Sequence, residues 1–180
     1  MAARALLEQV GDEPQQLAGC CLAVSKPLLQ ALLSNLPQRP DLILSVGCGS
    51  GLLEALLLQL GHGQLDLYGV EVPSCDCTLL PPERVLRVAG TRSLHPDAIL
   101  ASVLMFVYPR VPALITSYLD ACVDGAFEKL VWLGHRSDWA DSEGIVIDAF
   151  ANVEIAHNVG LPDHEIMVVA TSPRSRAGTR

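Results

Sequence analysis

The segment 42–60, LILSVGCGSGLLEALLLQL, constrains the fold more than any other part of this chain. It begins as an uninterrupted apolar run, passes through glycines at positions 47, 49 and 51, and continues with leucines at helical spacing. A short apolar run is typical of a strand buried on both faces of a sheet, and a 3.6-residue period indicates a helix. The segment therefore predicts a buried strand over 41–47, a glycine-rich turn, and a helix over 51–60.

The rest of the chain repeats this alternation of strands and helices. Further strand patterns cover 65–72, 85–88, 98–107, 129–134, 152–157 and 165–171. Helical patterns cover 3–10, 17–36 and 111–123, and the mixed segment 138–150 indicates a loop or a short helix. Strand and helix in regular alternation predict a mainly parallel sheet wrapped by helices, in a single domain.

The glycines of the turn suggest a ligand site. In such a sheet, ligands bind where the first strand gives way to its helix, and the free amides of the helix start face them. Glycine permits positive φ there and lets a ligand approach the backbone. Glu71 ends the second strand, 24 residues after Gly47, where its carboxylate can accept hydrogen bonds from two ribose hydroxyls. We therefore expect a nucleotide-like ligand; the alternative is that the glycines serve only the turn.

The motif around the glycines narrows the choice of nucleotide. No lysine follows them as a Walker loop requires, and the third glycine of GxGxxG is missing. VGCGSG instead resembles motif I, GxGxG, of the class I S-adenosylmethionine-dependent methyltransferases. The resemblance extends over most of 41–172 and includes GVEV with Glu71, DAILASVLMFVYP, VDGAFEKLVWLG and the two closing strands.

The resemblance implies a fold and a domain layout. The fold is an α/β three-layer Rossmann-like sandwich with a mostly parallel seven-stranded sheet and an antiparallel last strand. Residues 1–40 would be a helical cover belonging to the same domain, 41–173 the methyltransferase-like core, and 174–180 a basic disordered tail.

The resemblance also implies a cofactor, S-adenosylmethionine. Carried over by position, Gly47, Gly49 and Gly51 would line its methionine and ribose parts, and Glu71 would bind the ribose hydroxyls. The adenine amine would bind Thr91 or a backbone carbonyl, because VAGTRS (88–93) lacks the acid common in the family. Ser45 stands where the family often has an acid at the end of the first strand, and no [DN]PP[YF] motif occurs.

Two polar residues after the fourth and fifth strands are candidates for catalysis. Methyl transfer depends mainly on holding the reactants in line, and a base is needed only where the acceptor must lose a proton. Imidazole is the side chain best suited to act as a base near neutral pH, so His135 is the candidate base, with an ordinary loop histidine as the alternative. Tyr108 would donate a proton or pack as a lid.

Composition limits the partners. The formal net charge of -8 offers no basic field for nucleic acid or a membrane surface, and we expect neither as a partner. Without a signal peptide or an apolar span, we expect a cytoplasmic protein. The six cysteines lack paired CxxC units, so we expect reduced thiols and no metal. The short chain fits a small-molecule acceptor or a protein partner that completes the site; the oligomeric state stays open.

Three functions remain open. The first is an S-adenosylmethionine-dependent methyltransferase with an unidentified acceptor. The second is a catalytically inactive methyltransferase-like binding module. The third is a nicotinamide-dependent oxidoreductase, which Glu71 fits but which the missing third glycine and the absent Tyr-x-x-x-Lys pair do not.

Overall fold

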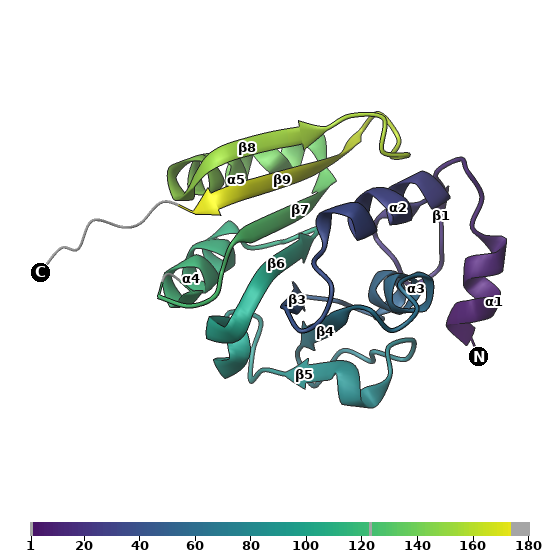
Figure 1. Cartoon of the computed structure of the whole chain (residues 1–180), viewed down its shortest axis with the longest axis horizontal. Coiled ribbons are helices and arrows are strands. Elements are labelled where there is room, and N and C mark those ends of the chain that lie inside the picture. The colour runs from purple at the N-terminus through teal and green to yellow at the C-terminus, as the bar shows by residue number, and fades with distance from the viewer. Residues whose placement is uncertain (1, 123, 174–180) are drawn as a thin grey trace, which may run out of the picture.

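A seven-stranded sheet with the order β5-β4-β3-β6-β7-β9-β8 forms the centre of the molecule (Figure 1). The computed structural model describes residues 2–122 and 124–173. In chain order, the strands of this sheet are β3 (Leu42–Val46), β4 (Asp66–Glu71), β5 (Val85–Arg87), β6 (Ala101–Val107), β7 (Lys129–His135), β8 (Phe150–Ala156) and β9 (Glu165–Pro173). Strands β3 to β7 pair in parallel, whereas β9 is antiparallel to both β7 and β8. The expected sheet, with its antiparallel last strand, is confirmed.

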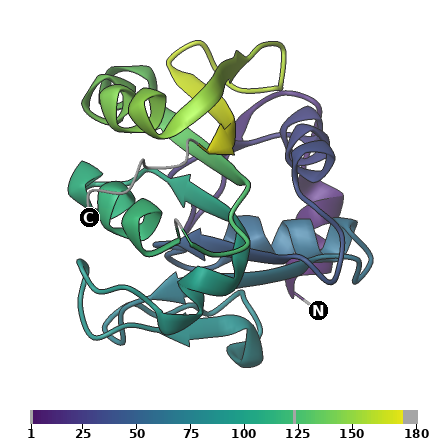
Figure 2. The same ribbon diagram turned by 60° about the vertical axis from the view of Figure 1, so that its left-hand side comes forward.

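Helices cover the two faces of the sheet. The helices α1 (Ala2–Gln9), α2 (Lys26–Asn35) and α3 (Leu52–Leu60) lie on one side, and α4 (Pro112–Cys122) and α5 (Arg136–Ala149) on the other (Figures 1 and 2). Alternate residues of β3 divide between these layers: Ile43 belongs to the apolar cluster with α2 and α3, and Leu44 to the cluster with α4 and α5. Both side chains are fully buried, as expected of a central strand.

The N-terminal cover differs from the expectation of a helix over 17–36. Only 26–35 is helical, and the preceding segment forms a two-stranded antiparallel ribbon of β1 (Gln15–Gln16) and β2 (Ala23–Val24). The helix begins here because the Ser25 hydroxyl accepts a hydrogen bond from the Leu28 amide at 3.2 Å and Pro27 follows the cap. Gly19 has φ +88°, which a helix does not allow.

The segment expected as a loop or short helix after β7 is also different. It forms the 14-residue helix α5. Trp139, Ser142 and Val146 are its buried residues, so one face at helical spacing packs on the sheet while the rest carries charge. A helix was one of the two expected alternatives, but it is longer than expected; Ser142 on its buried face interrupts the apolar pattern.

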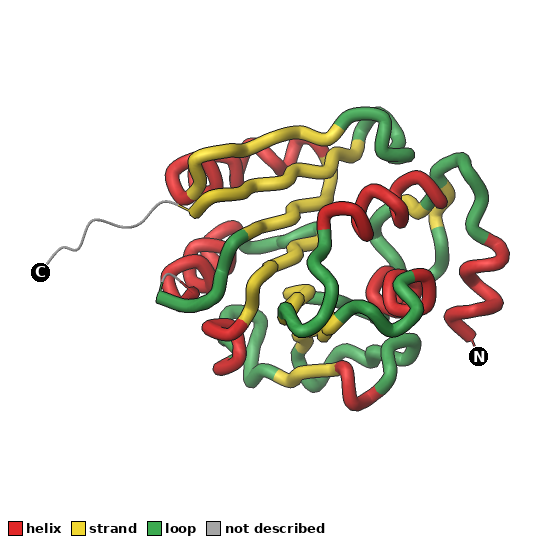
Figure 3. The backbone as a smooth tube through the Cα atoms, viewed as in Figure 1, coloured by secondary structure: helices red, strands yellow, loops and turns green. Residues whose placement is uncertain are grey.

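Short helical turns, drawn red in Figure 3, are the only helices in the two connections flanking β5, and neither is an α-helix. They are the 3-10 helices η1 (Pro82–Arg84) and η2 (Pro96–Leu100). The strand expected over 98–107 therefore begins at Ala101, after η2. As a result, no α-helix directly precedes or follows β5, at the edge of the sheet.

The basic tail expected over 174–180 lies outside the described residues. In the two described ranges, the helices are too short or too polar for any to cross a membrane.

Candidate functional site

The glycine turn, residues 47–51, joins β3 to α3 at the carboxyl edge of the sheet. Gly47, Gly49 and Gly51 have φ values of +76°, +57° and +76°. Side chains with a Cβ rarely adopt this left-handed region, so the turn requires glycine at each of the three positions. Gly51 is also the N-cap of α3.

The three glycines have different surroundings. A Cβ added at Gly47 or Gly49 would meet no atom within 4 Å, whereas at Gly51 it would lie 2.5 Å from the Cβ of Leu80. Gly47 and Gly49 therefore leave open space in front of the backbone, which a side chain would fill. Gly51 instead makes room for Leu80, so the structure gives it a packing role inside the turn.

Glu71 and the glycine turn lie together, as the sequence predicted. The amide of Gly49 donates a hydrogen bond to Glu71 Oε2 at 2.8 Å, and the Val72 amide donates to Oε1 at 2.9 Å. A carboxylate has about four lone-pair positions, so each oxygen retains capacity for one more donor. The half-buried Glu71 is thus held at the turn in a fixed orientation with acceptor capacity to spare.

Two cysteines, Cys48 within the turn and Cys77 in the loop after β4, stabilise the backbone of the turn. The Cys77 thiol donates to the carbonyl oxygen of Gly49 at 2.9 Å, and its sulfur lies 3.6 Å from that of Cys48. Gly69 makes room for this pair, because a Cβ there would collide with Cys48 Sγ. Burial raises the pKa of both thiols. Protonated thiols can donate hydrogen bonds but are poor nucleophiles, so these cysteines hold the turn in place.

A buried carboxylate also lies beneath the turn. Glu54, on α3, is 1% exposed, and its Oε1 accepts a hydrogen bond from the Ser45 hydroxyl at 2.5 Å. Its Oε2 has no hydrogen-bond partner among the described residues. Burial raises the pKa of this carboxyl to about 7. An acid from the following helix thus contacts Ser45, the residue at the position where the family often has an acid.

Tyr108 follows β6 and is tied to a second buried carboxylate. Its hydroxyl donates to Glu165 Oε1 at 2.5 Å, and its φ is +50°. Glu165, the first residue of β9, is 4% exposed and also accepts from the Ala23 amide of β2 at 3.1 Å. Burial raises the pKa of the Tyr108 phenol, and the hydrogen bond to Glu165 raises it further. The phenol therefore stays protonated and can act as a donor.

His135 serves as the N-cap of α5. Its Nδ1 accepts a hydrogen bond from the Ser137 amide at 3.2 Å, and its ring lies 5.5 Å from that of His164. This leaves Nε2 as the nitrogen that a substrate could use. The role of His135 as a base stays a prediction, because the structure itself gives the side chain a capping role.

The remaining residues to be placed near the carboxyl edge of the sheet are Thr91 and the N-terminal segment 19–23. Thr91 is exposed in the turn after β5, four residues beyond Arg87, the register partner of Glu71. The Ser50 hydroxyl of the turn donates to the carbonyl oxygen of Gly19 at 2.7 Å. The segment 19–23 therefore runs from the glycine turn to Glu165 and covers the space between them.

The turn and Glu71 were predictable from the sequence, whereas Glu54 and Glu165 were not among the expected site residues. Glu54 is a single acid within a leucine run, and Glu165 precedes an apolar strand. The sequence did offer one signal of a buried acid: an acidic residue at a position that the hydrophobic period assigns to an apolar residue. Within the described ranges, no group of three His, Cys, Asp or Glu side chains could hold a metal ion.

Comparisons with known proteins give a match at the level of structure. No family model and no curated protein sequence matches the chain. The precorrin-6y C5,15-methyltransferase of Geobacter metallireducens superposes with a TM-score of 0.58 at 14% identity, covering 91% of this chain and 97% of that one. Human N-acetylserotonin methyltransferase, solved in complex with S-adenosylmethionine, gives 0.56 at 13% identity and covers 83% and 51%.

The S-adenosylmethionine-dependent methyltransferase SibL gives a TM-score of 0.55 at 17% identity, covering 82% of this chain and 53% of its own. The chain thus spans about half the length of SibL and of the human enzyme. At these identities the comparisons establish the fold, which is that of the class I S-adenosylmethionine-dependent methyltransferases. The expected resemblance to this group, based on VGCGSG and its flanking motifs, is confirmed at the level of the fold.

Proposed function

We propose that the chain binds S-adenosylmethionine at the glycine turn and transfers its methyl group to an acceptor. The observation that carries this proposal is the hydrogen bond from the Gly49 amide to Glu71, next to open space at Gly47 and Gly49. A fixed carboxylate beside a backbone without side chains suits a ligand with a ribose diol. The fold shared with methyltransferases of several kinds supports the same ligand.

The residues of the turn fit this cofactor. Glu71 would accept hydrogen bonds from the ribose hydroxyls with its remaining lone pairs. The backbone at Gly47 and Gly49 would lie against the methionine part, because a Cβ at either position would fill the space in front of it. Thr91 stays the candidate for the adenine amine. When bound, the cofactor supplies an electrophilic methyl group on a positively charged sulfur.

The acceptor would bind at the edge between Tyr108 and His135. The Tyr108 phenol, held by Glu165, can donate a hydrogen bond only by giving up that contact, so it acts mainly as a wall and a positioning group. His135 Nε2 is the group that could take a proton from an acceptor. The segment 19–23 would exclude water from this edge, which favours reaction of the bound acceptor over exposure to solvent.

A methyltransferase-like module that binds without catalysis is the second candidate. It is favoured by the fact that both catalytic candidates already have structural partners: His135 caps α5, and Tyr108 is bonded to a buried carboxylate. A nicotinamide-dependent oxidoreductase is less well supported, because the turn lacks the third glycine of the dinucleotide motif.

Calorimetric titration with S-adenosylhomocysteine, with NADH as the control ligand, tests the binding step. We expect micromolar binding of the first and none of the second; binding of NADH alone would overturn the proposal. Transfer of a labelled methyl group to a panel of small phenols, amines and thiols then separates the enzyme from the inactive module. Cofactor binding without transfer to any member, with or without cell extract as a source of partners, would favour the module.

A further inference from the structure

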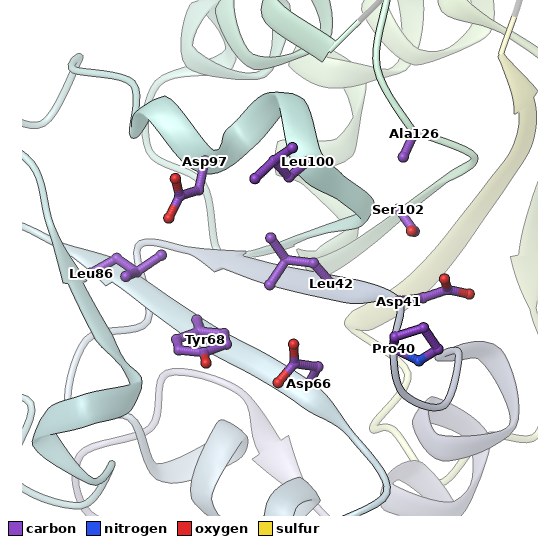
Figure 4. A pocket seen from close by; sticks show the side chains of 10 residues that line it. All are labelled: Pro40, Asp41, Leu42, Asp66, Tyr68, Leu86, Asp97, Leu100, Ser102 and Ala126. Carbon is purple, nitrogen blue, oxygen red and sulfur yellow. The ribbon is translucent and has the colours of Figure 1, made fainter.

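A groove lies at the amino-terminal ends of the central strands, on the edge of the sheet opposite to the glycine turn (Figure 4). Its volume is about 470 Å³. Leu42, Tyr68 and Leu86 rise from β3, β4 and β5 to form its floor, and Leu100 of η2 faces them from above (Figure 4). The groove is therefore apolar at its centre and lies between the sheet and a single 3-10 helix.

The groove exists because an α-helix is missing from this face of the sheet. Leu94, Ile99 and Leu100, all in or beside η2, are 37%, 46% and 60% exposed. Within the described ranges, the remaining large apolar side chains of comparable exposure are Ile147 and Ile155. Leu100 lines the groove itself, and Leu94 and Ile99 belong to the same segment of the chain. Contiguous exposed apolar surface is typical of sites that bind a partner.

The charges around the groove are not balanced. Asp66 is paired with two arginines, Arg84 and Arg39, which contact its Oδ1 at 2.9 and 3.3 Å, so these three side chains together carry one positive charge. Asp41 and Asp97 stand at the two ends of the groove (Figure 4), and neither forms an ion pair with an arginine or lysine of the described residues. Asp97 has only His95 near it, with Nδ1 at 3.8 Å. The apolar floor is thus bounded by a carboxylate at each end.

We propose that this groove binds a segment of a partner protein in which apolar side chains lie between two basic residues. The apolar residues would cover Leu42, Tyr68 and Leu86 and pack against Leu100, and the basic residues would pair with Asp41 and Asp97. Charge complementarity selects this chemistry. A second copy of the chain fits poorly, because two molecules that each carry a net charge of -8 repel one another.

Short peptides with a lysine at each end and a variable number of leucines between them serve as the probe. Titration into isotopically labelled protein, followed by amide chemical shifts, should perturb Leu42, Tyr68, Leu86 and Leu100 together. A matched peptide with glutamate at each end should not bind. Failure of every lysine peptide to shift these amides, or equal binding of the glutamate peptides, would overturn the proposal.

Substitutions at Asp41, Asp97 and Leu100, called the rim variants, give the second measurement. Asp41→Asn and Asp97→Asn should each weaken binding about three- to tenfold at low salt and less at high salt, because partly exposed charges are screened. Leu100→Ser should weaken it about tenfold. Ile147→Ser and Asp148→Asn, on α5, are the matched controls and should bind as the wild type does. Equal loss in the control variants would contradict a site in the groove.

Light scattering tests the competing occupant. If the wild type were a dimer that Leu100→Ser converts to a monomer, a second copy would occupy the face and the proposal would be wrong. All rim variants should bind S-adenosylhomocysteine as the wild type does, since the groove and the glycine turn lie at opposite edges. The two proposals can therefore fail independently.

Discussion

The hydroxyl of Ser45 and the carboxylate of Glu54 lie 2.5 Å apart directly beneath the glycine turn. Ser45 belongs to β3 and Glu54 to α3, so this one hydrogen bond joins the two elements that the turn connects. Both residues are at most 1% exposed. A polar contact thus supports the turn inside an otherwise leucine-rich interface. The protonation state of the Glu54 carboxyl therefore affects the stability of the protein.

Glu54→Gln should change the pH dependence of stability. Burial raises the pKa of this carboxyl from 4.5 to about 7 in the folded state. Between these values the folded protein holds a proton that the unfolded chain has lost, so the free energy of unfolding falls as pH rises. The total is about 3 kcal/mol at 1.4 kcal/mol per pKa unit. Urea unfolding at pH 5 and pH 8 should show this loss in the wild type and not in the variant. Parallel pH curves for the two proteins would contradict the assignment.

Glu71→Ala should weaken binding of S-adenosylhomocysteine by about 1–3 kcal/mol, the range for a lost hydrogen bond to a charged group. Calorimetry measures this loss. Glu83→Ala, which removes an exposed acid of η1, is the matched control and should leave the affinity unchanged. Unchanged affinity in a folded Glu71→Ala variant would mean that the carboxylate only caps the turn.

Alanine at Gly49 and at Gly51 should have different effects. Both substitutions force a Cβ into the left-handed region, at a cost of about 1–2 kcal/mol. Gly51→Ala adds a collision with Leu80 and should lower stability by about 1–3 kcal/mol more, as overpacking does. Gly49→Ala instead fills the open space and should mainly reduce cofactor affinity. Chemical denaturation and calorimetry on both variants separate the two; the same stability loss in each would contradict the packing role of Gly51.

Tyr108→Phe should lower the free energy of unfolding by about 1–3 kcal/mol, because it leaves the buried Glu165 with one hydrogen bond fewer. Thermal unfolding measures this change. S-adenosylhomocysteine affinity should stay as in the wild type, since the Tyr108 hydroxyl points to Glu165 and not to the glycine turn. Tyr68→Phe, in the groove, is the control for loss of a tyrosine hydroxyl and should change stability less.

The succession of strands and helices along the chain could be predicted because its signals are local, whereas the seven-stranded sheet with its antiparallel last strand was expected from the family resemblance. The glycines at the end of β3, and the apolar runs bounded by turns, announce each element without knowledge of its neighbours. The N-terminal ribbon could not be predicted in this way, because β1 and β2 are two residues each and depend on the contact of Ala23 with Glu165. The length of helix α5 was underestimated because Ser142 occupies a buried position on its packing face.

The candidate site was only half predictable for the same reason. Gly49 and Glu71 follow a spacing that can be read along the chain. The leucine period around Glu54 offered a sign of burial, but the hydrogen-bond partners of Glu54 and Glu165 depend on contacts that the sequence does not give. His135 was placed correctly at the end of β7, but its role as a helix cap depends on α5 starting at Arg136, earlier than the expected segment 138–150.

Strand β3 has the glycine turn at its carboxyl end and the groove at its amino end. At about 3.3 Å per residue, its five residues place the two ends about 17 Å apart. Two ligands can therefore occupy the molecule at the same time, one at each end of a single rigid segment. If a peptide in the groove changes cofactor affinity through β3, thermodynamic linkage requires the cofactor to change peptide affinity by the same factor. Measuring either affinity with the other ligand saturating thus reports the coupling free energy of both.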